Sequence, residues 1–406
     1  MRTRIVLGVG AGIAAYKAAE LLRLLTESGH HVRVVPTADS LRFVGAATWA
    51  ALSGQPVTAS PFDDVHEVPH VRLGQEADLV IVAPATADLL ARAATGRADD
   101  LLTSVLLTAR CPVVFAPAMH TEMWEHPATS ANVSTLRQRG ALVLEPASGR
   151  LTGADTGPGR LPEPDELFHT AVRVLARGGA GLAPDLAGRR VVVTAGGTRE
   201  EIDPVRFLGN WSSGRQGYAL ARTAAARGAE VTLVSANVSL PDPAGAKVER
   251  VVSAADLRAA VLAAAAGADA VVMAAAVADY RPQARNEHKM KKAGAPPDPL
   301  RLVENPDILR ELASGRPAGQ VIVGFAAETE DIAAHGQAKL AAKGADLLVV
   351  NQVGRGIAFG TDDNEALVLA ADGSSTPVPR GPKDVLADVV WDLVAARLPG
   401  PDQHGP

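Results

Sequence analysis

The sequence contains little cysteine and no excess of charge of one sign. Cys111 is the only cysteine in 406 residues, which excludes a disulfide framework and a cysteine-ligated zinc or iron–sulfur site and favours a reducing compartment. The 40 basic and 45 acidic residues give a net charge of −5, so we expect no nucleic-acid surface and no polybasic membrane tail. With 47% hydrophobic and 21% charged residues, the chain has the composition of a globular protein, and we expect it to be cytoplasmic.

Targeting signals and long apolar segments are also missing. The apolar run at residues 5–9 is short and ends in glycines, which is unlike a signal peptide. The most apolar stretch, residues 259–278, is divided by Gly267 and Asp269 into an alanine-rich part and a valine-rich part. This division predicts a helix followed by a buried strand and not a membrane span.

Lysine is scarce, because only eight of the 40 basic residues are lysines and the other 32 are arginines. Five of the eight lie in two short clusters, namely Lys289, Lys291 and Lys292, then Lys339 and Lys343. A flexible ammonium group acts on phosphate as a point charge, which a guanidinium group does not. The clusters are therefore consistent with phosphate binding, or with chance placement on solvated helix faces.

The first half of the sequence alternates strand and helix patterns. Strands are expected at 4–9, 31–36, 78–83, 112–116 and 142–145, and helices at 13–28, 99–108, 121–139 and 165–175. This alternation predicts a doubly wound parallel α/β sheet with ligands at the carboxyl ends of its strands. Residues 148–160 are rich in Gly, Thr and Asp and are predicted to form a loop.

A second alternating unit begins at residue 189. Its strands are expected at 189–195, 230–235, 270–274, 321–324 and 346–350, and its helices at 216–227, 254–266, 332–343 and 383–396. Residues 281–301 follow neither period and are predicted to form a long surface loop. We therefore expect domains at 1–178 and 189–398, a linker at 179–188 and a tail at 399–406.

A glycine-rich motif follows the first strand. Gly10-Ala11-Gly12-Ile13-Ala14-Ala15 matches the GxGxxA fingerprint, whose glycines let backbone N–H groups approach a phosphate at a helix N-terminus. An NAD enzyme would also need Asp or Glu after the second strand, but Val35-Pro36-Thr37 stands there. The motif predicts a phosphate site and argues against NAD, and a purely structural turn is the alternative.

Three further features of the first half are weaker. Ala83-Pro84-Ala85-Thr86 and Pro117-Ala118-Met119-His120 follow strands where such a sheet presents ligands, although helix initiation explains them equally. His70 precedes a strand-sized run, and an imidazole titrates near neutral pH. Cys111 precedes a buried strand and is expected to be a small buried apolar residue.

Two segments of the second half predict an anion site. Thr194–Glu200 follows a strand, and Asn210-Trp211-Ser212-Ser213-Gly214 precedes the next helix, whose N-terminus and two hydroxyls suit an anion. The GK[ST] signature of a Walker A loop is absent. A plain helix cap is the alternative explanation.

Together, these segments resemble one enzyme family. The motifs are Gly12–Lys17, Ala83–Asp88, Pro117–Met119 with Met123, and Gly157–Arg160 in the first half, and Thr194–Glu200, Asp203–Arg206, Asn210 with Ser212–Gly214, Ala274–Tyr280, Lys289–Lys292, Asn305–Ile308 and Gly324–Thr329 in the second. Over residues 4–396 the sequence is similar to the bifunctional phosphopantothenoylcysteine decarboxylase/phosphopantothenate–cysteine ligase family of bacterial coenzyme A biosynthesis.

The resemblance implies that the first domain is a flavodoxin-like or Rossmann-like, FMN-dependent cysteine decarboxylase. FMN would oxidise the cysteinyl thiol, carbon dioxide would leave, and the reduced flavin would return a hydride. His70 matches the catalytic histidine, and Met119 and His120 match substrate-binding positions. The positions implied for FMN are Gly10, Gly12, Ile13, Thr37, Ala83, Ala85 and Thr86.

Three positions depart from the family's pattern. His120 stands where the family commonly has the Asn that seats the substrate carboxylate, and Gly10 stands where it usually has Ser. The flap at residues 148–160 lacks the cysteine that usually donates the last proton. We expect decarboxylation to be retained, with Asp155, Thr152 or water as the donor.

For the second, Rossmann-like domain the resemblance implies CTP-dependent ligation. The carboxylate of 4′-phosphopantothenate would attack the α-phosphate of CTP, and the amine of cysteine would then displace CMP from the acyl-cytidylate. Mg²⁺ and lysines would neutralise the charge, with no residue assigned to the metal. Asn210 would polarise the acyl carbonyl, and Lys289 would contact phosphate. The other implied substrate positions are Met273, Ala274, Ala275, Asp279, Pro306, Asp307, Ile308, Leu309, Phe325, Lys339 and Lys343.

Two alternatives remain at this point. The chain would be a ligase only, with an FMN-binding scaffold impaired in its reductive step, or a flavin-binding regulatory protein that acts through protein contacts. The resemblance also implies trimers of the first domain and dimers of the second, and thus a homo-oligomer such as a dodecamer. Small-molecule substrates are expected, with no nucleic-acid or membrane partner.

Overall fold

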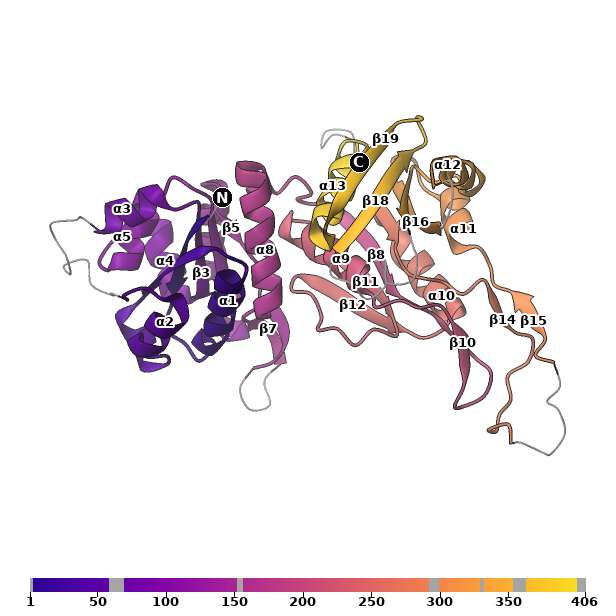
Figure 1. Ribbon diagram of the computed structural model, residues 1–406, viewed down its shortest axis with the longest axis horizontal. Helices are drawn as coiled ribbons and strands as arrows, with labels where there is room; N and C mark the ends of the chain where they lie inside the picture. The colour runs from indigo at the N-terminus through magenta and orange to yellow at the C-terminus, as the bar shows by residue number, and fades with distance from the viewer. Residues whose placement is uncertain are drawn as a thin grey trace. The chain divides into compact units, whose positions relative to one another are not determined.

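The structure is a computed structural model that describes residues 3–57, 69–151, 156–291, 299–328, 332–352 and 363–399. The chain folds into two compact units, residues 1–184 with 242–245 and residues 185–241 with 246–406. Each unit contains one main sheet covered by helices (Figure 1). Among the described residues, no helix is both long enough and apolar enough to cross a membrane.

The first unit is built on five parallel strands in the order β2-β1-β3-β4-β5, which confirms the predicted doubly wound sheet. The strands are β1 (Arg4–Val9), β2 (His31–Pro36), β3 (Leu79–Ala85), β4 (Val113–Pro117) and β5 (Leu142–Val143). The helices are α1 (Ala15–Glu27), α2 (Ala46–Ser53), α3 (Pro69–Glu76), α4 (Ala87–Thr95), α5 (Leu101–Thr108), α6 (Thr121–Trp124), α7 (Pro127–Gln138) and α8 (Pro164–Arg177), with the 3₁₀ helices η1 (Ala38–Arg42) and η3 (Gly178–Leu182).

Both faces of this sheet are buried. Side chains such as Leu7 and Ile81 pack against α1, α2 and α8, whereas Val6 and Val82, which point to the opposite face, pack against α4, α5 and α7. Because neither face meets water, the strands are almost continuously apolar, and this is why they could be located from the sequence.

The second unit contains an eight-stranded sheet in the order β12-β11-β8-β13-β16-β17-β18-β19. The strands of this unit are β8 (Arg190–Gly196), β9 (Arg199–Glu201), β10 (Phe207–Gly209), β11 (Glu230–Ala236), β12 (Ala246–Val251), β13 (Ala270–Met273), β14 (Tyr280–Pro282), β15 (Leu302–Glu304), β16 (Val321–Glu328), β17 (Leu347–Gln352), β18 (Asp363–Ala370) and β19 (Ser375–Pro382). The helices are α9 (Arg215–Ala226), α10 (Ala254–Ala265), α11 (Ile308–Gly315), α12 (Ile332–Lys343) and α13 (Lys383–Ala395).

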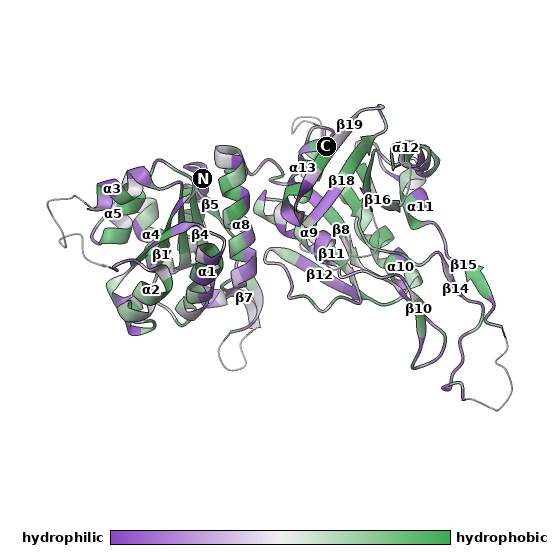
Figure 2. Cartoon of the chain, in the orientation of Figure 1, coloured by the Kyte–Doolittle hydropathy of each residue, from purple (hydrophilic) through white to green (hydrophobic). Residues whose placement is uncertain are grey.

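The sheet of the second unit is parallel from β12 to β17, and β18 and β19 extend it with antiparallel pairing. Helices α9 and α13 cover one face, and α10, α11 and α12 cover the other. The central strand β16 is strongly hydrophobic, as Figure 2 shows by its green colour. The pairs β9–β10 and β14–β15 are separate two-stranded hairpins outside this sheet.

Several predicted elements are wrong. The helix predicted at 121–139 is two helices, α6 and α7, because Pro127 begins a new helix and cannot continue the preceding one. The loop predicted at 148–160 contains an antiparallel pair, β6 (Ala147–Arg150) and β7 (Thr156–Arg160). The strand-sized run after His70 is helix α3. The loop predicted at 281–301 begins in β14, which pairs with β15.

Candidate active sites

The predicted FMN-binding segments of the first unit meet at the carboxyl edge of its sheet. The backbone N–H of Gly10 donates to Pro84 O (3.0 Å), and that of Thr37 donates to Val9 O (2.9 Å). The N–H of Ala118 donates to Ala85 O (3.1 Å). A Cβ on Gly10 would lie 2.5 Å from Pro84 O, so the first motif packs tightly on the carboxyl end of β3. The segments that follow four strands thus form one continuous edge.

This edge has polar groups that suit a phosphate. The hydroxyl Oγ1 of Thr37 is buried and has no hydrogen-bond partner among the described residues. Helix α1 begins at Ala15 without a side-chain cap. The N–H groups of Ala15 and Lys17 donate to Gly12 O and Ala14 O (3.0 Å each), so an anion here would meet the Gly10–Ala14 backbone that leads into the helix. Nothing lies within 4 Å of a Cβ built on Gly12, and the Ile13 side chain is 79% exposed. The residues therefore fit a phosphate-bearing ligand bound from outside.

The β6–β7 hairpin is fastened to the loop that holds Met119 and His120. The N–H of Met119 donates to Gly159 O (2.9 Å), and Thr121 Oγ1 donates to Pro158 O (2.9 Å). His120 itself is exposed. The two predicted proton donors, residues 152 and 155, lie outside the described residues.

His70 does not join this edge within the described residues of one chain. It lies in the first turn of α3, and its backbone oxygen accepts a hydrogen bond from Thr108 Oγ1 (2.8 Å). Thr108 ends α5, and α5 leads into the start of β4, so the contact lies toward the amino end of the sheet. Gly10 and Thr37 follow the carboxyl ends of β1 and β2. The Nδ1 atom of His70 is buried and has no hydrogen-bond partner in the part of the chain that the structure describes.

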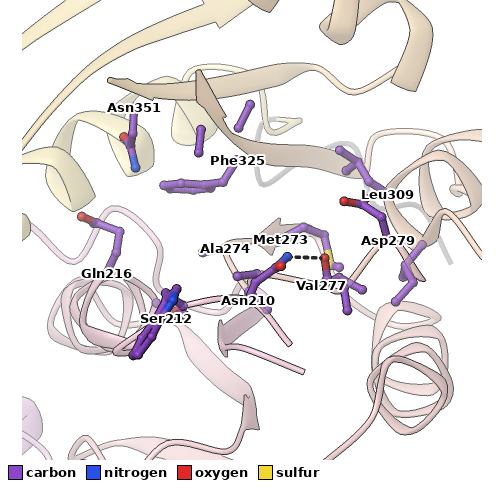
Figure 3. A pocket seen from close by; sticks show the side chains of 18 of the residues that line it. Asn210, Ser212, Gln216, Met273, Ala274, Val277, Asp279, Leu309, Phe325 and Asn351 are labelled. Atoms are coloured by element: carbon purple, nitrogen blue, oxygen red, sulfur yellow. Dashed lines mark hydrogen bonds between the residues drawn. The ribbon is translucent and has the colours of Figure 1, made fainter. Parts of the chain in front are cut away.

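The second unit contains a cavity of about 860 Å³ at the carboxyl ends of β13, β16 and β17. It gathers eleven predicted substrate positions and Asn210 from separate segments, as Figure 3 shows for Asn210, Phe325 and Asp279. These positions are Asn210, Met273, Ala274, Ala275, Asp279, Pro306, Asp307, Ile308, Leu309, Phe325, Lys339 and Lys343. The Ser212–Gly217 segment, which includes the N-terminus of α9, lines the same cavity.

Hydrogen bonds fix several of these side chains. Asn210 Nδ2 donates to Val277 O (3.0 Å), the bond drawn in Figure 3. Asp307 caps α11 by accepting from Arg310 N (3.1 Å), and its other oxygen accepts from Lys343 Nζ (2.5 Å). The cap and the ion pair together hold the Lys343 ammonium at the cavity wall. The cavity thus combines a helix N-terminus with the lysines Lys339, Lys343 and Lys383, which suits a polyanionic ligand.

The sequence analysis missed a group of polar residues at the cavity wall. Asn364 Nδ2 donates to Gln216 Oε1 (3.0 Å), and Gln216 Nε2 donates to Lys383 O (3.2 Å). Asn351 Oδ1 is buried without a partner among the described residues. All four residues line the cavity. They stand singly at the ends of strands and helices, so no motif in the sequence marks them.

Lys289 is exposed and does not line this cavity, unlike the other predicted residues of the second half. It lies between β14 and β15, in a hairpin that projects from the body of the unit, as does the β9–β10 hairpin (Figure 1). Both projections carry exposed apolar side chains, including Phe207 (50% exposed) and Tyr280 (48%). Lys291 is also exposed, and residue 292 lies outside the described residues.

The described residues offer no cluster of three or more His, Cys, Asp or Glu side chains that would hold a metal ion. No metal ligand was predicted from the sequence. The acidic residues that line the cavity are Asp279, Glu304 and Asp307.

Comparison with known proteins identifies the family. The family model "Flavoprotein" matches residues 1–176, and the model "DNA/pantothenate metabolism flavoprotein C-terminal domain" matches residues 186–398. The coenzyme A biosynthesis bifunctional protein CoaBC of Mycolicibacterium smegmatis is 58% identical over 411 residues, covering 99% of each chain. The corresponding protein of Mycobacterium tuberculosis H37Rv is 58% identical over 98% of this chain and 97% of its own. That of Bacillus subtilis is 43% identical over 96% of each. The chain belongs to this family.

Membership confirms the resemblance found in the sequence. The protein is a bifunctional enzyme of coenzyme A biosynthesis, with a decarboxylase-type flavoprotein domain followed by a ligase domain. The alternative of a ligase with an inactive first domain is not favoured, because relatives that match over nearly their full length are named bifunctional.

Proposed function

We propose that the second unit joins 4′-phosphopantothenate to L-cysteine with CTP as the activating nucleotide, and that the first unit decarboxylates the product with FMN. The observation that carries this proposal is that one cavity gathers Asn210, the α9 N-terminus and the predicted lysines Lys339 and Lys343. The anionic groups of the two reactants repel each other. The lysine ammonium groups and the helix N-terminus of the cavity offset that repulsion.

In the ligase, the substrate carboxylate attacks the α-phosphorus of CTP and pyrophosphate leaves. The ammonium groups of Lys339 and Lys343 and the N–H groups at the start of α9 bind the phosphates. Asp279 and Phe325 line the cavity beside the 273–275 backbone, where they hold the nucleoside. Mg²⁺ accompanies CTP in this proposal, and we assign it no protein ligand.

In the second ligase step, the amine of cysteine attacks the acyl carbon, CMP leaves and the amine loses a proton. Asn210 Nδ2 carries two hydrogens and gives one to Val277 O. Its second N–H is available to the acyl oxygen. The bond to Val277 orients the amide before the substrate binds, so that little reorganisation is needed when negative charge develops on that oxygen.

In the first unit, the carboxyl edge with the buried hydroxyl of Thr37 and the open space at Gly12 fits the phosphate of FMN. FMN supplies the oxidation of the cysteinyl thiol and the later return of a hydride. Ala83, Ala85 and Thr86 leave room for the ring beside backbone, and Thr86 Oγ1, which accepts from Leu89 N (3.2 Å), still has its own hydrogen to donate. Met119, His120 and the β6–β7 hairpin flank the substrate.

Both units act as parts of a homo-oligomer in this proposal. Ile13 (79% exposed), Tyr16 (60%) and Met123 (47%) lie around the first site, and Trp211 (88%) lies beside the second. Contiguous exposed apolar surface marks protein-interaction or ligand-binding sites, and a second copy would cover these side chains in this proposal. A second copy would also bring His70 and Lys289 to sites that they do not reach in their own chain. We expect trimers of the first unit and dimers of the second, which a dodecamer satisfies, in the cytoplasm.

The test of both activities uses the full-length protein with phosphopantothenate, cysteine, CTP and Mg²⁺, and identifies the products by mass. We expect pyrophosphate, CMP and phosphopantothenoylcysteine, followed by carbon dioxide and phosphopantetheine. Ligation at the same rate without CTP, or with ATP alone, would overturn the nucleotide assignment.

The decarboxylase half is tested separately by supplying phosphopantothenoylcysteine without oxygen and recording the flavin spectrum. We expect carbon dioxide release with return of the oxidised flavin, because the chain retains a proton donor despite the missing flap cysteine. Release of carbon dioxide with the flavin left reduced would locate the defect in the reductive step. No release at all would contradict the proposal for this unit.

A further inference from the structure

The turn between β9 and β10 contains a buried carboxylate. The side chain of Asp203 has no exposed surface. Its Oδ1 accepts hydrogen bonds from Val205 N (2.8 Å) and Arg206 N (2.9 Å), which closes the turn. A carboxylate of this kind is a common way to hold a turn, and one oxygen is sufficient for it.

The other oxygen of Asp203 reaches a distant part of the chain. Oδ2 accepts from Arg206 Nε (2.9 Å) and from the backbone N–H of Met290 (3.2 Å). Arg206 Nη2 also donates to Met290 O (2.8 Å). Both polar backbone groups of Met290 are therefore held by one acid–base pair from the β9–β10 turn.

Lys289 lies immediately beside this anchor. A second anchor lies three residues earlier, where Asn286 N donates to Ile202 O (2.9 Å). The backbone of Lys289 is therefore held between two hydrogen-bonded points on the same turn. The β10 strand that leaves this turn ends at Gly209, directly before Asn210. One turn thus connects the segments that carry both proposed catalytic residues of the ligase.

We propose that Asp203 is a positioning residue of the ligase, which fixes the backbone that carries Lys289 against the β9–β10 turn. The proposal rests on the role given above to Lys289. A lysine side chain is long and flexible, so the placement of its ammonium depends on the placement of its backbone. A misplacement of about 1 Å at a reacting group can lower a rate by about 100-fold.

The charge of Asp203 suits this role at neutral pH. The hydrogen bonds from the Arg206 guanidinium, followed by the backbone N–H groups, hold the pKa of Asp203 well below its usual range. The carboxylate therefore stays ionised, and hydrogen bonds to an ionised acceptor are stronger than neutral ones.

Asp203→Asn separates the two roles of this side chain, which are to close the β9–β10 turn and to hold the Met290 backbone. The amide keeps one oxygen for the Val205 and Arg206 N–H groups, but its NH₂ group then faces Met290 N and the Arg206 guanidinium, which are all donors. In the full-length protein we expect faster hydrogen–deuterium exchange over residues 283–291 and about 10- to 100-fold slower acyl-cytidylate formation.

The matched control is Glu201→Gln. Glu201 pairs with Arg285 (2.7 Å) and thus links the same two segments, but both side chains are largely exposed. Because surface ion pairs contribute little, we expect exchange and rate within about twofold of the parent protein. Equal slowing by both variants would mean that any contact to the segment matters, and would overturn a specific role for Asp203.

A double variant distinguishes positioning from a general structural role. If Asp203 acts through Lys289, Asp203→Asn should not slow a protein that already carries Lys289→Gln. Further slowing would overturn the inference. An unchanged rate in Lys289→Gln alone would refute the role of Lys289 itself, whereas slow Lys289→Gln with fast Asp203→Asn would refute only the role of Asp203.

Should Asp203→Asn fail to fold, Arg206→Lys keeps the buried carboxylate and removes the paired contact to Met290 O, and the same exchange and rate changes are expected.

Discussion

The two units use the same edge of similar sheets, but they build different kinds of site there. In the first unit the chain passes quickly from strand to helix, and a single residue, Thr86, separates β3 from α4. In the second unit the connections at this edge include a much longer one. The 18 residues 197–214 separate β8 from α9. Short connections offer mainly backbone N–H groups, whereas long ones add side chains.

The difference matches the chemistry proposed for each unit. A flavin brings its own redox chemistry, so the protein needs chiefly to bind it, and small residues that expose backbone suffice. Joining two anionic reactants requires cations and amides placed around them, and the longer connecting segments of the second unit supply these groups. Each of the following experiments alters one residue of one unit.

The largest expected effect is that of Lys289→Gln. Loss of one phosphate-binding cation should lower acyl-cytidylate formation by about 100- to 1,000-fold, while decarboxylation of supplied phosphopantothenoylcysteine stays unchanged. Quenched single-turnover assays with mass detection measure the intermediate. Lys247→Gln on the exposed face of β12 is the matched control and should change neither rate. A parallel loss of decarboxylation would show that the two units depend on each other.

Gly74→Ala is the corresponding test of the first unit. A Cβ at this position of α3 would lie 2.2 Å from Thr108 Oγ1 and 2.9 Å from Val105 O. The methyl group must therefore push α3 away from α5 and shift His70, whose backbone oxygen binds Thr108. We expect decarboxylation to fall by about 10- to 100-fold, with the ligase rate unchanged.

The control for Gly74→Ala is Gly179→Ala, because nothing lies within 4 Å of a Cβ built there. It should leave flavin content and carbon dioxide release within experimental error. If Gly74→Ala is equally harmless, α3 is not held as the structure describes, and the placement of His70 must be reconsidered.

Some features of both units could be predicted from the sequence, and others could not. The strands were found because both faces of each sheet are buried, so that segments such as Val191–Val193 are apolar at every position. Many of the positions that line the cavity of the second unit, such as Asn210 and Phe325, were implied by the family resemblance, because they lie in the motifs that carry it. The helix α3 was missed because eight residues with a central glycine, Gly74, give too short a pattern to show a helical period.

The partners and distances of side chains could not be predicted in the same way. Gln216 and Asn364 come from opposite ends of the second unit's sequence and meet only because β18 returns beside β17. Nothing in the Lys289 motif shows that its hairpin projects away from the cavity. Such facts depend on the tertiary path of the chain, and a local pattern contains no information about it.

A smaller effect is expected from Gly217→Ala in α9. Its Cβ would lie 2.5 Å from Ala195 Cβ and 2.6 Å from Thr194 O, so the helix would have to move away from β8. Overpacking of this kind costs about 1–3 kcal/mol. Denaturant unfolding of the full chain, followed by the ligase rate, measures the change. Gly315→Ala in α11, where the Cβ meets nothing within 4 Å, should alter the unfolding free energy by less than about 1 kcal/mol.

The smallest effect is predicted for the only cysteine. The resemblance implies a flap cysteine as the usual proton donor. Cys111 is the only cysteine of the sequence, and it lies before β4 and not in the β6–β7 hairpin. Burial raises the pKa of the Cys111 thiol, so less of it is thiolate at pH 8 than in free cysteine, whose pKa is about 8.5. We therefore expect alkylation of the native protein to be slower than that of free cysteine and to accelerate as the pH rises further. Cys111 is only half-buried and not fully buried as predicted. Cys111→Ser should leave carbon dioxide release and flavin reoxidation within about twofold, because a hydroxyl replaces a thiol of similar size far from the proposed chemistry. Loss of flavin reoxidation alone in this variant would reveal that the thiol supplies the final proton after all. That result would also remove the contrast between a first unit whose site is formed mainly by backbone groups and a second unit whose site is formed mainly by side chains.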